Sequence, residues 1–252
     1  MILNPIRRVL STFSARKVKA LLMGGQACIL YGASEFSRDS DFVVLPDPGN
    51  LERLREALSD LAAQPVAVPP LGPEVLRRGH AVHFRCTHPD VAGLRIDLMS
   101  NLRGVDPFAS LWERRTTVTL EDGLPVDLLS LPDLVAAKKT QRDKDWPMIR
   151  RLVEADALSA VDATPERVRF WLREARTPGL LARLCDRYPT EASDVAKSRP
   201  AVKRALDHDL SGMSGALDHE EREERRRDAE YWAPLRQELE TLRHNRPRPE
   251  EG

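Results

Sequence analysis

The sequence has few aromatic residues, few cysteines and no excess of charge of either sign. Aromatic residues make up 5% of the 252 residues, and 39 basic residues balance 39 acidic ones. Cys28, Cys86 and Cys185 are far apart and odd in number, which argues against a disulfide framework and favours buried thiols in a reducing compartment. The balanced charge gives no argument for or against a nucleic-acid partner, because only a local patch would carry that signal.

Long hydrophobic runs and several well-known motifs are also missing. No stretch approaches the roughly 20 apolar residues that a membrane helix needs. Residues 1–17 are basic but lack the apolar stretch and the cleavage site of a secretory signal. Neither a Gly-x-Ser-x-Gly motif nor a Walker-type loop is present. The hydrophobic content of 41% is that of a globular protein. We therefore expect a cytoplasmic protein without a membrane partner.

The order of hydrophobic patterns predicts an α+β fold. Short apolar runs at residues 18–23 and 39–45 are typical of strands, and two hairpins are expected at residues 81–99 and 116–129. From Ser130 onward the pattern becomes helical. We expect a mixed sheet with helices in residues 1–130 and a mainly helical C-terminal domain in residues 131–252, although this order of elements also permits a single compact unit.

Three positions carry signals for a helix start. Asn50 is placed to cap a helix whose leucines, at positions 51, 54, 58 and 61, follow helical spacing. Ser130-x-x-Asp133 resembles a capping box, and Thr164 precedes a proline in the first turn of another helix. The charged tail at residues 219–243 is expected to be a solvated helix that Pro234 kinks or divides.

The most informative stretch combines a glycine pair with an acidic pair. Gly24 and Gly25 follow the first strand, where they permit a sharp turn and the close approach of a ligand to the backbone. Asp39 and Asp41 are two residues apart on a predicted strand, so both carboxylates face one side. Their mutual repulsion would be relieved by a divalent cation, and oxygen ligands suit Mg²⁺. The competing interpretation is a solvated turn, because aspartate is common in loops.

These residues, in this order, resemble the nucleotidyltransferase superfamily, which has the polymerase-β-like fold. The variant Gly-Gly-x-Ala, Tyr-Gly, Ser-x-Asp-x-Asp-Phe looks like the toxin-like branch, which holds abortive-infection toxins and aminoglycoside nucleotidyltransferases. The match covers about the first half of the chain, with weaker support up to Asp145. The resemblance implies that Gly24 and Gly25 hold the triphosphate, that Ser37 helps at the phosphates, and that Asp39 and Asp41 bind Mg²⁺ or Mn²⁺.

A third carboxylate is usual in such proteins, and two residues compete for the position. Asp97 alternates with Ile96 and Leu98 on a predicted strand, so it projects from one face while they pack on the other. It would act as a metal ligand or as the base for the acceptor hydroxyl. Asp127 has similar surroundings and is the rival.

The segment after the capping box adds two candidates by resemblance. Lys138 would contact the nucleotide phosphates, and Asp145 would lie close to Lys138 or to the metal. The alternative for Lys138 is a basic helix end favoured by the helix dipole. Glu35 departs from the family's pattern, which often has an arginine there, and this departure leaves open an altered donor or a weakened enzyme.

A zinc site at His80, His83, Cys86 and His88 is set aside, because His83 and Cys86 would point to opposite faces of a strand. His83 and Arg85 share a face instead and would line the acceptor side of the cleft.

The sequence thus predicts a metal-dependent nucleotidyltransferase that moves a nucleoside monophosphate from a nucleoside triphosphate to a hydroxyl of RNA, protein or a small molecule. The alternative is a nucleotide-binding or regulatory member of the same fold without turnover, for example one half of a toxin–antitoxin pair.

Overall fold

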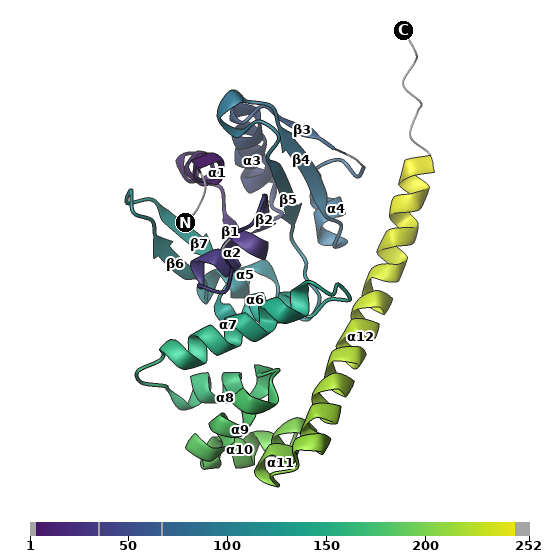
Figure 1. The fold of residues 1–252 in the computed structure, drawn as a ribbon. Coiled ribbons are helices and arrows are strands. Elements are labelled where there is room, and N and C mark those ends of the chain that lie inside the picture. Colours follow the sequence, from purple (N-terminus) through teal and green to yellow (C-terminus); the bar gives the residue numbers. More distant parts are fainter. Residues whose placement is uncertain (1–3, 35, 67, 245–252) are drawn as a thin grey trace. The chain divides into compact units, whose positions relative to one another are not determined.

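The computed structural model describes residues 4–34, 36–66 and 68–244, and it confirms the α+β class (Figure 1). The chain forms two compact units. The first unit takes the described residues within 1–30, 35–134 and 230–252, and the second takes those within 31–34 and 135–229. The chain passes from one unit to the other within α6 (Leu131–Ala137) and again within α12 (Leu210–His244).

The first unit contains the whole described sheet and the helices that pack on it. Its strands are β1 (Ala20–Met23), β2 (Asp39–Val44), β3 (Ala63–Pro65), β4 (Val82–Cys86), β5 (Arg95–Met99), β6 (Thr116–Thr119) and β7 (Pro125–Leu128). Its helices are α1 (Asn4–Ala15), α2 (Gly24–Leu30), α3 (Pro48–Asp60), α4 (Pro73–Arg77), the 3₁₀ turn η1 (Pro89–Val91) and α5 (Phe108–Glu113).

The seven strands form one mixed sheet in the order β3-β4-β5-β2-β1-β7-β6. The two expected hairpins are confirmed, because β4 pairs with β5 and β6 pairs with β7, both antiparallel. Parallel pairs join β2 to β5 and β1 to β7. These parallel pairs bring residues that are distant in sequence to the centre of the sheet, beside β1 and β2.

Side-chain alternation gives the central strands one apolar and one acidic face. On β2, Ser40 and Phe42 are buried, whereas Asp39 is exposed and Asp41 is half-buried. The Phe42 ring packs 4.8 Å from the ring of Phe13 on α1, measured between centroids. Because successive side chains of a strand point to opposite faces, the two aspartates lie on the face that α1 does not cover.

The prediction that Asn50 caps a helix is wrong. Helix α3 begins earlier, and the side chain of Asp47 caps it by accepting a hydrogen bond from the backbone N–H of Asn50. Asn50 is fully buried, and its amide joins the start of β1 to the end of β2. It accepts from the N–H of Lys19 at 2.7 Å and donates to the carbonyls of Lys19 and Leu45, each at 3.0 Å.

We expect Asn50→Ala to lower the free energy of unfolding by about 2–4 kcal/mol, because it leaves several buried backbone groups without partners. Urea denaturation measures the change. Glu52→Ala, an exposed position on the same helix, is the control and should change stability by less than about 0.5 kcal/mol. Equal effects of the two substitutions would contradict a bridging role for Asn50.

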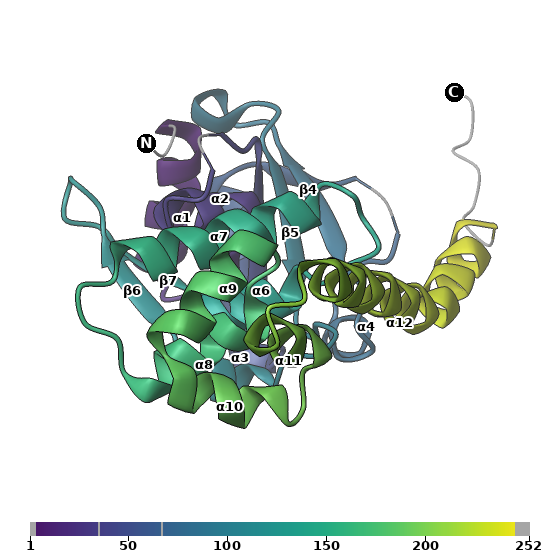
Figure 2. The same ribbon diagram turned by 60° about the horizontal axis from the view of Figure 1, so that its bottom comes forward.

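The second unit is helical throughout its described length. Its helices are α7 (Asp145–Ser159), α8 (Pro165–Glu174), α9 (Pro178–Arg187), α10 (Pro189–Ala196) and α11 (Pro200–Leu206), together with parts of α6 and α12. Figure 2 shows α8 to α11 gathered in one cluster. The expected start of α8 is confirmed, since the Thr164 hydroxyl accepts from the N–H of Arg167.

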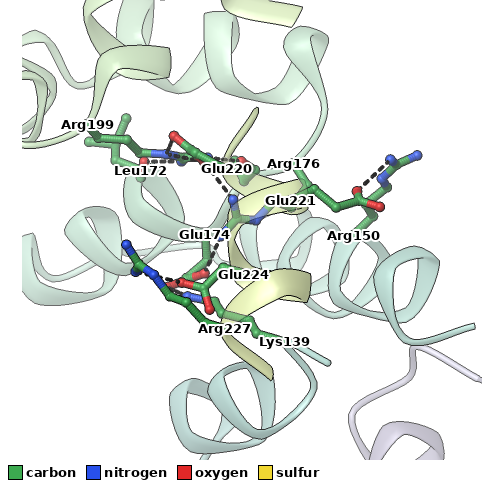
Figure 3. Close-up of polar contacts among 11 residues, drawn as sticks. Lys139, Arg150, Leu172, Glu174, Arg176, Arg199, Glu220, Glu221, Glu224 and Arg227 are labelled. Carbon is green, nitrogen blue, oxygen red and sulfur yellow. Dashed lines mark hydrogen bonds and ion pairs between the residues drawn. The ribbon is translucent and has the colours of Figure 1, made fainter. Parts of the chain in front are cut away.

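A buried ionic network ties the first part of α12 to α8 and α11 (Figure 3). Arg199 is 7% exposed and donates to the carbonyls of Leu172 and Ala175 at the end of α8, at 2.6 and 2.7 Å. It also pairs with Glu220 of α12 at 2.8 Å, and Arg176 meets the same carboxylate at 2.6 Å. The paired carboxylate and carbonyls compensate the burial of these arginines.

The tail helix begins earlier than expected, and Pro234 does not divide it, because α12 runs without a break from Leu210 to His244. The three cysteines are free and buried, as expected. Among the described helices, none combines the length and the apolar character needed to cross a membrane.

Candidate active site

Strands β4, β5 and β2 are neighbours in the sheet (Figure 1), and their register arranges the candidate site residues in two rows across them. In one row His83 of β4 is opposite Asp97 of β5, which is opposite Asp41 of β2. Residues opposite one another on paired strands share a face of the sheet. The structure therefore brings Asp97 beside Asp41, on the same face as Asp39.

The second row lies two residues away along the strands. Arg85 of β4 is opposite Arg95 of β5, which is opposite Asp39 of β2. Acidic side chains thus occupy the β2 side of this face, and cationic ones the β4 side.

The glycine pair lies directly against this face. Met23, the last residue of β1, is opposite Asp41, so the chain turns at Gly24 beside that carboxylate. A Cβ atom added at Gly24 would fall 1.9 Å from Oδ2 of Asp41, and one added at Gly25 would fall 2.3 Å from Oγ of Ser37. Gly24 also has φ +67°, in the left-handed region that favours glycine. Both positions therefore need glycine, because the backbone touches the candidate site residues.

The sequence analysis missed Gln26, which holds Ser37 in place. Its side chain is fully buried, and its Nε2 donates to the carbonyl oxygen of Ser37 at 2.9 Å. A glutamine directly after the glycine pair is the signal that the sequence offered, and its burial is seen only in the structure. Gln26 thereby fixes the loop before β2 against the start of α2.

We expect Gly24→Ala to destabilise the protein by at least about 1 kcal/mol more than Gly104→Ala. Both glycines have a positive φ, +67° and +70°, but a Cβ at Gly104 meets no atom within 4 Å. The difference between the two free energies of unfolding therefore isolates the collision with Asp41. Equal losses in urea denaturation would show that the backbone does not approach the carboxylate this closely.

Asp97 is held by two neighbours on the same face. Its Oδ1 accepts from Nε of Arg95 at 2.7 Å and lies 2.8 Å from Nδ1 of His83. Nη2 of Arg95 also lies 3.0 Å from that imidazole nitrogen. With a proton on Nδ1, His83 donates to Asp97, and without one it accepts from Arg95. The contact between Arg95 and Asp97 persists in either state. Arg95 is a second residue that the sequence analysis missed.

The charge of Asp97 is stabilised in spite of its burial. Burial alone raises the pKa of this carboxyl, but the hydrogen bonds and charges of His83 and Arg95 outweigh it and lower the pKa below its usual value. The pKa of Arg95 is raised, first by its hydrogen bond to Asp97 and further by the charges of Asp97, Asp39 and Asp41. The Arg95 guanidinium therefore interacts electrostatically with all three candidate carboxylates.

Asp127, the rival third carboxylate, lies on β7. The pair Leu22 and Leu128 sets the register of β7 against β1, which puts Asp127 level with Leu21, two residues before Met23. Its Oδ1 accepts from the Thr117 hydroxyl at 2.5 Å and lies 3.1 Å from Nε of Arg115. Asp97 is the nearer neighbour of Asp41 by strand order.

The carboxylates fit a magnesium ion by their chemistry. Mg²⁺ is commonly held by one or two carboxylates and completes its shell with water and substrate phosphates. Asp39 and Asp41 supply two such carboxylates on one face. Among the described residues, no group of three or more His, Cys, Asp or Glu side chains has a geometry that could hold a metal ion. Metal binding by Asp39, Asp41 and Asp97 therefore stays a prediction.

Lys138 and Asp145 lie together in the second unit. Nζ of Lys138 is 3.2 Å from Oδ1 of Asp145, and both residues are buried, at 8% and 2% exposure. Asp145 also accepts from the Thr140 hydroxyl at 2.6 Å and from Nε of Arg142 at 2.8 Å. The contact of Lys138 with nucleotide phosphates stays a prediction.

We expect Asp145→Asn to lower the free energy of unfolding at pH 7 by about 3–5 kcal/mol, because it leaves a buried lysine without its partner. Urea denaturation should show a smaller loss for the double variant Lys138→Met/Asp145→Asn. Asp143→Asn, at an exposed carboxylate nearby, is the control. A double variant less stable than Asp145→Asn would contradict the pairing.

This pair also sets a pH dependence. Burial raises the pKa of Asp145, but Lys138, Thr140 and Arg142 outweigh it and lower the pKa below its usual value. Its stabilisation is therefore complete above the unfolded-state pKa of about 4 and is lost as the pH falls through the lower folded-state value.

Glu35 lies outside the described residues. The histidines and the cysteine once considered for zinc do not cluster within the described chain, and burial raises the pKa of Cys86 to about 11.

Comparison with known proteins finds distant likenesses among solved structures alone. No family model matches the chain, and no curated protein matches it. Among solved structures it is similar to one described as "Crystal structure of putative nucleotidyltransferase from H. pylori", with 13% sequence identity over 90% of this chain and 94% of that one. The TM-score is 0.41. A likeness at this level does not assign a function, which has to be argued from the residues of the site.

Proposed function

We propose that the chain is a metal-dependent nucleotidyltransferase, which transfers a nucleoside monophosphate from a nucleoside triphosphate to an acceptor hydroxyl. The observation that carries the proposal is the approach of the glycine turn to the acidic pair, with Gly24 against Asp41 and Gly25 against Ser37. A triphosphate and a divalent cation need such an arrangement, in which exposed backbone and carboxylates adjoin one another.

Some residues of the proposed site contact the triphosphate, and others hold the metal ion. Gly24, Gly25 and Ser37 receive the triphosphate, and Asp39 and Asp41 hold Mg²⁺ or Mn²⁺. The metal, when bound, would neutralise phosphate charge and lower the pKa of a coordinated hydroxyl. Lys138 is a further proposed contact of the phosphates, with Asp145 as its partner.

The transfer makes one bond and breaks one. The acceptor oxygen forms a bond to the α-phosphorus, and the bond from that phosphorus to the oxygen bridging the β-phosphorus breaks. Pyrophosphate leaves with the bridging oxygen. The hydroxyl proton passes to a carboxylate of the site, for which Asp97 is the candidate.

A second function is favoured by the state of Asp97. Because Arg95 and His83 hold one oxygen of this carboxylate, the chain could bind a nucleoside triphosphate without turnover. Such a protein would act as a nucleotide-binding or regulatory module, for example within a toxin–antitoxin pair.

We expect Asp39→Asn and Asp41→Asn each to lower transfer at least about 100-fold, because each removes a charge that holds the metal. The assay incubates the protein with each α-labelled nucleoside triphosphate, Mg²⁺ or Mn²⁺, and total RNA, a protein mixture or an aminoglycoside. Chelation of the metal should abolish transfer as well. Asp162→Asn, an exposed aspartate in the second unit, is the control and should leave transfer unchanged.

The outcomes separate the two functions. Full transfer by both Asp39→Asn and Asp41→Asn would exclude this site as the active site. Tight triphosphate binding without transfer to any acceptor would favour the binding module.

A further inference from the structure

Two arginines lie directly opposite one another beside the acidic pair. Arg85 and Arg95 are register partners on the antiparallel strands β4 and β5. Like charges in such a position are destabilising, because the side chains leave the same face of the sheet within about 5 Å of each other. Negative charge close to the two arginines would relieve this repulsion.

The negative charge present compensates only one of the two arginines. Arg95 binds Asp97 at 2.7 Å and is influenced by Asp39 and Asp41. Arg85 is exposed, and within the described part of the chain no carboxylate pairs with it. Its neighbour on β3 is Gln64, which is also exposed and brings no charge. One guanidinium on this face therefore lacks an anionic partner.

The position of Arg85 relative to the acids is set by strand order. β4 is separated from β2 only by β5, so its backbone lies two strand spacings, or about 10 Å, from that of Asp39 and Asp41. β1 and the glycine turn lie on the opposite side of β2. A substrate that reaches Arg85 therefore approaches the acids from the side away from the glycine turn.

We propose that Arg85, with Arg95 beside it, forms an acceptor-side subsite for a phosphate group, and that the acceptor is the end of a single-stranded nucleic acid. The inference rests on the proposed function, because the acceptor side is defined by the acidic pair and the glycine turn. A terminal hydroxyl lies at Asp39 and Asp41, and a backbone phosphate of the same strand lies at Arg85.

The charges on this face select among the acceptor classes. The planar guanidinium group matches the oxygens of a phosphate in a bidentate manner. A polycationic aminoglycoside brings no anion to Arg85, and neither does a neutral protein hydroxyl. A phosphate-bearing strand satisfies the arginine and relieves the repulsion within the pair.

Binding of a fluorescein-labelled single-stranded RNA oligonucleotide, followed by anisotropy without nucleoside triphosphate, tests the subsite apart from turnover. We expect Arg85→Gln to weaken binding about fivefold and to lower the slope of log K against log salt by about 0.7, the value for one phosphate contact with a single strand. Arg85→Lys should keep most of the affinity. Arg55→Gln, an exposed arginine on α3, should leave both quantities unchanged.

Titration of the same variants with a nucleoside triphosphate and with pyrophosphate identifies the source of the phosphate. An unchanged triphosphate affinity in Arg85→Gln supports the acceptor subsite. A loss of triphosphate or pyrophosphate affinity without a loss of RNA affinity would overturn it and assign Arg85 to the donor.

The failure of this inference is distinct from the failure of the proposed function. If transfer needs Asp39 and Asp41 but neither transfer nor RNA binding changes in Arg85→Gln, the acceptor subsite is overturned. The proposal of a nucleotidyltransferase then stands. If RNA binding depends on Arg85 but the protein transfers no nucleotide, the phosphate subsite stands. The proposal of a nucleotidyltransferase is then overturned.

Discussion

The close approach of the Gly24 backbone to the carboxylate of Asp41 is the constraint on which the candidate site depends. A strand that ends at Met23 has to turn at the next residue, and the turn has room only if no Cβ atom occupies the space beside Oδ2 of Asp41. The positive φ of Gly24 directs the chain into α2 at this point. Asn50 secures the other end of the same strand pair, since its amide bridges the start of β1 and the end of β2.

The acidic face is compatible with a stable sheet because alternate side chains of each strand point to an apolar face and to a polar face. Phe42 fills the apolar face against Phe13, while Asp39 and Asp41 face the other way. On β5 the half-buried Asp97 would be costly if it were alone, and Arg95 and His83 compensate its charge. The cations on this face are therefore part of what allows three carboxylates to share it.

Local patterns in the sequence predicted the local structure well, and distant pairings only in part. The alternation around Asp41, the hairpin that carries Asp97 and the cap at Thr164 depend on residues a few positions apart, and all three are present. Asn50 was misjudged because Asp47, three residues earlier, is an equally suitable cap, and only the tertiary structure decides between them. The parallel pairing of β1 with β7 joins Leu22 to Leu128, and no local pattern encodes it. The interaction of Arg95 with Asp97 joins two residues that are neighbours on one strand face, and the alternation pattern that predicts a shared face does not predict a hydrogen bond across it.

The pairing of Asp97 with Arg95 sets a condition on any reaction at this face. A metal ion that recruits Asp97 has to compete with a guanidinium for the same carboxylate, and it has to tolerate that guanidinium near Asp39 and Asp41. Phosphate oxygens change this balance, because an anionic strand placed over Arg85 and Arg95 offers the guanidinium group of Arg95 an alternative partner. Arg95 could then turn from Asp97 toward the substrate, and Asp97 would be released for the metal or for the hydroxyl proton. The proposed acceptor subsite would thus couple the arrival of a phosphate-bearing strand to the release of Asp97, which Arg95 binds in the structure.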